Sequence, residues 1–205
     1  MAEQESDFQL IRNYKEGDES SLNLLLRKYQ QKIYWHARKM AGNHMDADEI
    51  VQEVMLTLLK SIGDFKFQSS FSTWLYRIIT TRTLNYLKRR RVREIFSGSN
   101  GSEEENEKVS LKTRRTSILE ELENKEKLDF LDRVLKEIPA KQREIFIMRH
   151  FDEMTYEEIA DITGKSVGGL KAKYYHANRH KLGRTKDNPN NLFFQLANCF
   201  RPKFL

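Results

Sequence analysis

The clearest local structural signal in the chain is Thr155-Tyr-Glu-Glu-Ile-Ala-Asp-Ile-Thr-Gly-Lys-Ser166. Thr155 and Glu158 have the spacing of a capping box, in which the hydroxyl accepts a hydrogen bond from the Glu158 amide and the carboxylate accepts one from the Thr155 amide. Gly164 suits a tight turn that needs a positive φ, and Ser166 can cap a second helix directly after it. The stretch therefore predicts a helix-turn-helix.

The charges on the two predicted helices differ. Five acids and no base lie between Asp152 and Asp161, whereas six bases and no acid lie between Lys165 and Arg184. The second helix is therefore the one suited to the major groove of DNA, and an ordinary solvated helix pair stays open as the alternative. The residues expected near bases or phosphates are Ser166, Gly168, Gly169, Lys171, Ala172 and Lys173, with Arg179 further along.

The composition of the whole chain favours helices and excludes a membrane protein. The 205 residues contain 36 Lys and Arg against 30 Asp and Glu, and only 9 Gly and 3 Pro, which argues against a turn-rich β-fold. No run approaches the roughly 18 apolar residues that cross a bilayer. The single cysteine, Cys199, excludes an intrachain disulfide, and the first ten residues do not resemble a signal peptide. We expect an all-α protein in the reducing cytoplasm.

The distribution of apolar residues predicts two small helical domains joined by a flexible linker, the second containing the helix-turn-helix. The linker is expected because the segment has few apolar residues to bury and many Ser, Gly and Glu. The predicted divisions are 1–95 for the N-terminal helical domain, 96–127 for the charged linker, 128–184 for the helix-turn-helix domain and 185–205 for a Phe-rich tail. Within the first domain, helices are predicted over 7–16, 19–41, 46–61 and 71–91.

Two further features of the first domain suggest binding surfaces. Five bases lie in Lys88-Arg-Arg-Arg-Val-Arg93, downstream of several aromatic residues, and unpaired bases bind to cationic grooves with flat side chains. Most of these aromatics are expected in the core, with Tyr76 and Tyr86 as the candidates for exposure. Asp46, Asp48, Glu49, Gln52 and Glu53 form an acidic helix face that could bind a basic protein or a metal.

Neither a metal site nor a cofactor is predicted. The acidic face lacks partner ligands elsewhere, and His176 and His180 supply only the first half of a zinc site. The chain has no phosphate-binding loop and no Gly-x-Ser-x-Gly motif, so we expect no enzymatic activity.

Three segments in order resemble bacterial sigma factors of the extracytoplasmic function (ECF) subfamily. Asp46-Ala-Asp-Glu-Ile-Val-Gln-Glu-Val-Met55 is similar to their Asp-Ala-Glu-Asp-Leu-x-Gln-Glu-x-Phe signature. Phe71-Ser-Thr-Trp-Leu-Tyr-Arg-Ile78 through Tyr86-Leu-Lys-Arg-Arg90 is similar to their promoter-melting segment. Ile138-Pro-Ala-Lys-Gln-Arg-Glu-Ile145, Met154-Thr-Tyr-Glu-Glu-Ile-Ala160 and Leu170-Lys-Ala-Lys173 resemble their second DNA-binding domain.

The resemblance implies a non-catalytic initiation subunit with two main partners, core RNA polymerase and promoter DNA, and a probable anti-sigma factor as a third. The docking face on the polymerase clamp helices would be Asp48, Glu49, Gln52 and Glu53. The minus-10 residues would be Lys66, Gln68, Ser69, Ser70, Trp74, Arg77, Asn85, Lys88, Arg89 and Arg90, with the 66–72 loop capturing a flipped base. The helix that starts at Ser166 would read the minus-35 element.

The chain departs from the family pattern at three places. Thr80-Thr81 stand where Arg-Asn is usual, Asn85 stands where Asp is common, and Gly168-Gly169 replace a polar, β-branched stretch. These departures concern promoter sequence rather than role. Two rival functions remain at this stage: a ligand-sensing regulator that dimerises on an operator without polymerase, and an adaptor that binds only proteins.

Overall fold

The structure is a computed structural model that describes residues 6–96 and 118–182. These residues form helices joined by short turns, with no strand among them. The N-terminal lobe contains α1 (Asp7–Lys15), α2 (Glu19–Ala41), α3 (His44–Ser61), the short 3-10 helix η1 (Ile62–Asp64) and α4 (Phe71–Phe96). The C-terminal lobe contains α5 (Ile118–Lys136), α6 (Ala140–His150), α7 (Tyr156–Thr163) and α8 (Val167–Leu182). The predicted all-α class is confirmed.

Residues at the helix ends explain the boundaries. Ser6, Asp18 and Asn43 accept hydrogen bonds from backbone amides in the first turns of α1, α2 and α3. Gly42 ends α2 in the left-handed conformation at φ 76°, which glycine adopts without strain. Ser70 caps α4 because its hydroxyl accepts a hydrogen bond from the Thr73 amide at 3.1 Å.

The helix-turn-helix has the local geometry that its sequence predicts. The Thr155 side chain accepts the Glu158 amide, and the Glu158 carboxylate accepts the Thr155 amide at 2.7 Å. Gly164 ends α7 at φ 67°, and the Ser166 hydroxyl accepts the Gly169 amide at the start of α8. Ile159 and Leu170 are fully buried and hold the two helices on the lobe.

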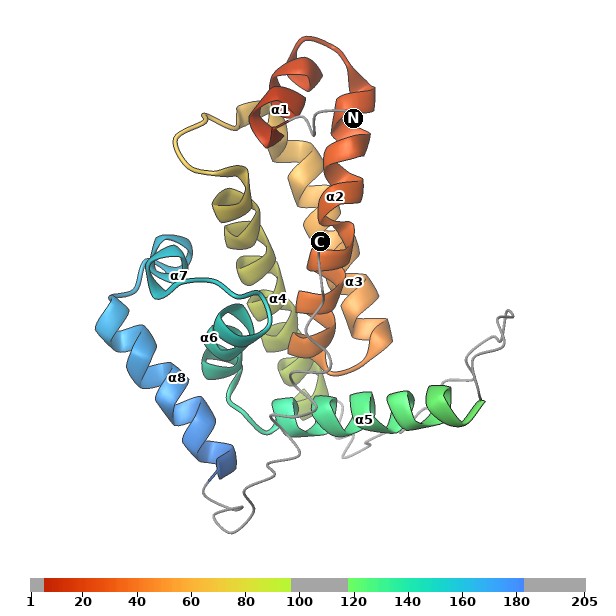
Figure 1. The fold of residues 1–205 in the computed structure, drawn as a ribbon, viewed down its shortest axis with the longest axis vertical. Helices are drawn as coiled ribbons and strands as arrows, with labels where there is room; N and C mark the ends of the chain where they lie inside the picture. The colour runs from red at the N-terminus through yellow and green to blue at the C-terminus, as the bar shows by residue number, and fades with distance from the viewer. Residues whose placement is uncertain (1–5, 97–117, 183–205) are drawn as a thin grey trace.

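The two lobes pack against each other along one side of α2 and α4 (Figure 1). Helix α6 contacts α2 and α4, α7 contacts α4, and α5 contacts the C-terminal end of α2. One cluster of buried apolar side chains runs through both lobes, from Ile33 and Leu75 to Ile145, Met148 and Ile159. The described residues therefore share a continuous core, which the prediction of two tethered domains did not anticipate.

The predicted end of α1 and the predicted start of α3 differ from the structure by one and two residues, and two other boundaries differ by more. Helix α4 continues to Phe96, past the expected end at Arg91. Helix α5 begins at Ile118, so the last part of the predicted linker is helical. The remainder of that linker, 97–117, and the Phe-rich tail, 185–205, lie outside the described residues.

Candidate protein- and nucleic-acid-binding surfaces

The acidic face lies on α3, on the side away from the apolar stripe. Ile50, Val54 and Leu58 of this helix are buried, whereas Glu49 and Gln52 are exposed. An exposed carboxylate and amide one turn apart offer a partner protein both charge and hydrogen bonds. The other two predicted members already have partners in the chain, because His44 lies 3.2 Å from Asp48 and Arg89 forms an ion pair with Glu53.

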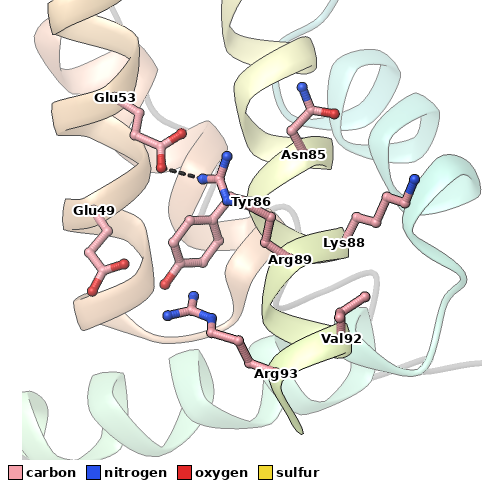
Figure 2. A pocket seen from close by; sticks show the side chains of 8 residues that line it. All are labelled: Glu49, Glu53, Asn85, Tyr86, Lys88, Arg89, Val92 and Arg93. Atoms are coloured by element: carbon pink, nitrogen blue, oxygen red, sulfur yellow. Dashed lines mark hydrogen bonds and ion pairs between the residues drawn. The ribbon is translucent and has the colours of Figure 1, made fainter. Parts of the chain in front are cut away.

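The acidic face and the basic cluster meet in a groove between α3 and α4 (Figure 2). Glu53 and Arg89 pair across it, and Arg90 pairs with Asp46 and, at 2.7 Å, with Glu94. Each of these arginines thus has an acidic counter-ion in the chain. The lining residues are Glu49, Glu53, Asn85, Tyr86, Lys88, Arg89, Val92 and Arg93.

Tyr86 also joins the two helices in this groove. Its ring is 3% exposed, and its hydroxyl donates a hydrogen bond to Asp46 at 2.6 Å. Burial and the Asp46 carboxylate raise the pKa of Tyr86, so the hydroxyl stays protonated and can donate. Tyr76 is also 3% exposed. The expectation that these two tyrosines could offer exposed stacking surfaces is therefore wrong, because both are packed in the core.

The loop before α4 is held by aromatic contacts that the sequence did not reveal. Phe67 has a left-handed backbone at φ 56°, which is strained for a residue with a bulky side chain. Its ring contacts Phe8 of α1 and Phe65, with centroids 5.5 Å and 5.1 Å apart. Lys15 donates a hydrogen bond to the Phe65 carbonyl at 2.8 Å. Helix α1 therefore supports this loop; the spacing of single aromatic residues gave no signal for that long-range packing.

The predicted minus-10 residues are spread along this loop and α4. Lys66 and Gln68 are exposed on the loop, Ser69 is half-buried, and Ser70 is occupied as the helix cap. Trp74 packs on Phe65 and Phe71 at the edge of the core. Asn85, Lys88 and Arg89 are exposed further along α4, and Arg90 is half-buried by its ion pairs. Arg77 is exposed as well, but its guanidinium donates hydrogen bonds to the carbonyl of Asp161 in α7.

The predicted recognition helix α8 has a free outer face. Leu170 and Ala177 point into the core, while every candidate except Lys173 is exposed. Lys173 is half-buried. The exposed candidates are Ser166, Gly168, Gly169, Lys171, Ala172 and Arg179. The helix thus presents polar and cationic side chains together, as a helix that enters a DNA groove must.

Ionisable side chains are buried where the lobes meet. His36 Nδ1 lies 2.7 Å from Asp152 Oδ2, and Arg38 pairs with Asp132 at 2.9 Å. Burial lowers the pKa of Lys39 to about 8, and it raises the pKa of Asp132 to about 6. Burial outweighs the opposing effect of Arg38 on Asp132, because removing a carboxylate from water costs more than this one ion pair returns.

Substituting Asp132 with Asn should change how stability depends on pH. Because the pKa of Asp132 is raised, the native state binds a proton more tightly than the unfolded chain between about pH 4 and pH 6. The free energy of unfolding of the wild type should therefore fall relative to Asp132→Asn as the pH rises through this window, by at most about 3 kcal/mol. Urea unfolding of both proteins at pH 4.5 and pH 7 measures the difference. If the two proteins differ in free energy of unfolding by the same amount at both pH values, the Asp132 carboxyl has an ordinary pKa.

Every helix in the described part of the chain is either too short or too polar to span a lipid bilayer. Within the same residues, no group of three or more His, Cys, Asp or Glu side chains could hold a metal ion.

Comparison with known proteins identifies both lobes. Residues 25–93 match the family model Sigma-70 region 2, and residues 130–180 match Sigma-70, region 4. The ECF RNA polymerase sigma-E factor of Escherichia coli K12 is 30% identical over 178 residues, which cover 86% of this chain and 93% of the relative. The RNA polymerase sigma-H factor of Pseudomonas aeruginosa is 27% identical over 184 residues, covering 86% and 92%.

Two solved structures share the fold. CnrH in complex with the cytosolic domain of CnrY has a TM-score of 0.63 at 19% identity, covering 90% of this chain and all of that one. The sigma factor RpoE in complex with the anti-sigma factor NepR from Bartonella quintana has a TM-score of 0.60 at 19% identity, covering 82% and 98%.

Proposed function

The chain belongs to the sigma-70 family as an ECF sigma factor, and on this premise we propose how its surfaces direct core RNA polymerase to promoters. The observation that carries the proposal is that the two kinds of surface the function needs lie on different helices. An exposed acidic face lies on α3, and an exposed cationic face lies on α8. A sigma factor needs both, because it must be mounted on a protein while it reads DNA.

The polymerase-binding surface is the α3 face of Asp48, Glu49, Gln52 and Glu53. Glu49 and Gln52 are the centre of the contact because they are exposed on the same side of the helix. Asp48 and Glu53 would exchange their partners within the chain, His44 and Arg89, for cations of polymerase. Such an exchange would keep both carboxylates paired, and it would release Arg89 from Glu53.

The minus-10 element would bind along the 66–72 loop and α4. Lys66 and Gln68 are exposed on the loop, next to Phe65, whose ring contacts Trp74. This arrangement suits the capture of a base that has flipped out of the DNA stack. Asn85, Lys88, Arg89 and Arg90 would then hold the strand and the upstream duplex through phosphate contacts. Flipping a base costs a few kcal/mol, which the polymerase contacts must offset.

The minus-35 element would bind to the outer face of α8. A side chain at Gly168 would meet no described atom within 4 Å, so packing inside the protein does not require glycine there. Close approach of the helix to the DNA backbone is the remaining physical reason for a residue without a side chain.

Substituting Gly168 with Ala should change stability and DNA binding in opposite directions. The free energy of unfolding should rise by up to about 1 kcal/mol, because alanine has a higher helix propensity than glycine. Binding of the polymerase complex to a minus-35 promoter should weaken, because the added methyl group meets the DNA backbone. Thermal unfolding and a mobility shift measure the two effects. Higher stability with unchanged promoter binding would show that Gly168 does not approach DNA.

The protein acts without catalysing a reaction of its own, inside the cytoplasm, where its polymerase lies. Its regulation would use an anti-sigma partner, as the sigma factor RpoE of Bartonella quintana was solved in complex with the anti-sigma factor NepR. The Phe-rich tail, outside the described residues, is a second proposed contact for such a partner.

Run-off transcription with purified core polymerase tests the function. Adding the protein should give promoter-specific products from genomic templates that core enzyme alone does not transcribe. The absence of any such product on a genome-wide template set would contradict the proposal. A footprint on specific duplex sites without polymerase would instead favour a regulator that acts alone.

A further inference from the structure

Helix α1 lies against the loop that precedes α4, at the same end of the N-terminal lobe (Figure 1). Two exposed cations of this helix, Arg12 and Lys15, stand beside the Phe67 ring of the loop. The guanidinium carbon of Arg12 lies 5.6 Å from the ring centroid, and the ammonium of Lys15 lies 5.2 Å from it. The sequence assigned neither cation to DNA, because Lys15 and Phe65 of the loop are 50 positions apart.

Contacts with α1 hold the Phe67 ring in place. Phe67 has φ 56°, a conformation that is unfavourable for a bulky residue and that persists only where the surrounding structure holds it. Phe8 of α1 contacts the ring in an edge arrangement, with 5.5 Å between the centroids. The Lys15 ammonium donates a hydrogen bond to the carbonyl of Phe65 at 2.8 Å. The loop, the ring and the neighbouring cations therefore form one packed unit.

These two cations differ from Arg89 of α4 in their counter-ions. Arg89 forms an ion pair with Glu53, whereas neither Arg12 nor Lys15 forms an ion pair within the described residues. Lys15 uses one of its three N–H donors on the Phe65 carbonyl. Since no carboxylate of the described residues pairs with the remaining donors or with the Arg12 guanidinium, these groups are available to an anion.

The position of both cations in the last turn of α1 has a simpler explanation, because positive charge there stabilises a helix through its dipole. That effect accounts for the type of residue, but not for two side chains that lie over a ring on a different segment. The attraction between a cation and an aromatic ring holds the cation in place without neutralising it. Arg12 and Lys15 are thus pre-organised for a ligand that carries negative charge.

A single DNA strand is the anion that fits this surface. When the loop of residues 66–72 captures a flipped base, the phosphates on either side of that base must lie beside the walls of the loop. Helix α1 is one of these walls, since Phe8 and Lys15 contact the loop. A guanidinium can bind a phosphate through two parallel hydrogen bonds. Phe8 is 38% exposed and offers an aromatic surface to a neighbouring base.

We propose that α1 is part of the surface that binds the separated DNA strand, with Arg12 and Lys15 as contacts to the backbone phosphates next to the captured base. The inference rests on the proposed function, because that function places the strand on the loop of residues 66–72. Phe67 is a positioning residue in this arrangement: its ring holds the two cations, and it need not touch the DNA.

Fluorescence anisotropy with a labelled single-stranded oligonucleotide tests the inference. The oligonucleotide carries the minus-10 sequence of a promoter that run-off transcription identifies, and it is titrated with the complex of core polymerase and the whole chain. Arg12→Gln should lower the affinity about tenfold, because it removes a charged hydrogen bond to phosphate. It should also reduce the slope of log affinity against log salt by about 0.7 in magnitude, the contribution of one phosphate contact on a single strand.

Arg27→Gln is the matched control, since it removes an exposed arginine of α2 that contacts neither the loop nor Phe67 in any described interaction. It should change neither the affinity nor the salt slope. Core polymerase should bind the wild type and both variants equally, because none of the changes lies on α3.

Neutral linkages in the oligonucleotide identify the phosphate that Arg12 contacts. Replacing one phosphate at a time with methylphosphonate removes one negative charge and leaves the bases unchanged. At a linkage next to the captured base, this change should weaken binding of the wild type about tenfold and binding of Arg12→Gln much less, since the partner cation is already absent. Equal losses for both proteins at every linkage would show that Arg12 does not contact the backbone.

Phe67→Gly separates the positioning of the cations from their contact with DNA. Glycine adopts a φ of 56° without strain, so the loop can keep its path while the ring is lost. The affinity for the single strand should fall severalfold because the cations are no longer held, while the salt slope should stay unchanged because both charges remain. An affinity equal to that of the wild type would overturn the positioning role of Phe67.

The outcomes separate this inference from the proposed function. Equal affinities and equal salt slopes for the wild type, Arg12→Gln and Arg27→Gln would overturn the role of α1 and leave the proposed function intact. Failure of the wild-type polymerase complex to bind the oligonucleotide at all would contradict the assignment of the loop and, with it, the role of α1.

Discussion

Replacing Glu49 and Gln52 together with Arg should abolish binding to core RNA polymerase. Both side chains are exposed on α3, and the double substitution places two cations in a face that is acidic in the wild type. Like charges brought together in an interface cost several kcal/mol, which corresponds to a loss of affinity of at least about a hundredfold. Fluorescence anisotropy of the labelled protein titrated with core enzyme measures the loss.

The fold should survive this double substitution, because neither side chain contributes to the core. Circular dichroism should therefore show unchanged helical content. Glu16→Arg with Gln30→Arg is the matched control: it changes the charge by the same amount at exposed positions outside α3. Unchanged polymerase binding by the α3 variant would refute the assignment of this face, whereas loss in the control as well would show a general effect of charge.

Replacing Lys171 and Lys173 with Ala should weaken promoter binding by the polymerase complex by at least about tenfold at moderate salt. Lys171 is exposed on the outer face of α8, with its ammonium near the ring of Tyr156, and Lys173 is half-buried beside it. Each phosphate contact contributes roughly 0.9 to the steepness with which the logarithm of the affinity falls against the logarithm of the salt concentration. Loss of two contacts should therefore reduce the magnitude of this slope by about 2. Mobility shifts at several salt concentrations measure both quantities.

The salt dependence distinguishes phosphate contacts from a loss of folding. Arg27→Ala removes an exposed cation of the N-terminal lobe and is the control. It should leave the slope of minus-35 promoter binding unchanged. A weaker double variant with an unchanged slope would place these lysines away from the phosphates.

Local patterns in the sequence correctly predicted the helices and most of their ends. The capping box at Thr155 and the glycine at position 164 form as expected, because a cap depends on residues only three or four positions apart. The acidic face on α3 and the free face of α8 were also predictable, since helical periodicity alone places those side chains on one side.

Contacts between distant segments were not predictable in the same way. Tyr86 was a candidate for exposure, and the structure buries it because its hydroxyl reaches Asp46 on the neighbouring helix. Phe8 and Lys15 of α1 support the loop before α4 through contacts between segments far apart in the sequence. The periodicity of apolar residues within one helix does not predict contacts of this kind. The same reason explains why Ile118 to Lys127 were expected in a linker, although they belong to a helix that packs on α2 at its C-terminal end.

The amino-acid sequence alone determined that this protein is helical, that it carries a helix-turn-helix, and which helix faces bear acids and bases, because capping and amphipathic spacing act within a few residues. The contact of Arg77 with the other lobe, and the burial of His36 and Lys39, follow from the packing of the whole chain. The free energy of those contacts comes from burying side chains far apart in the chain, and that burial exists only once the lobes have packed together.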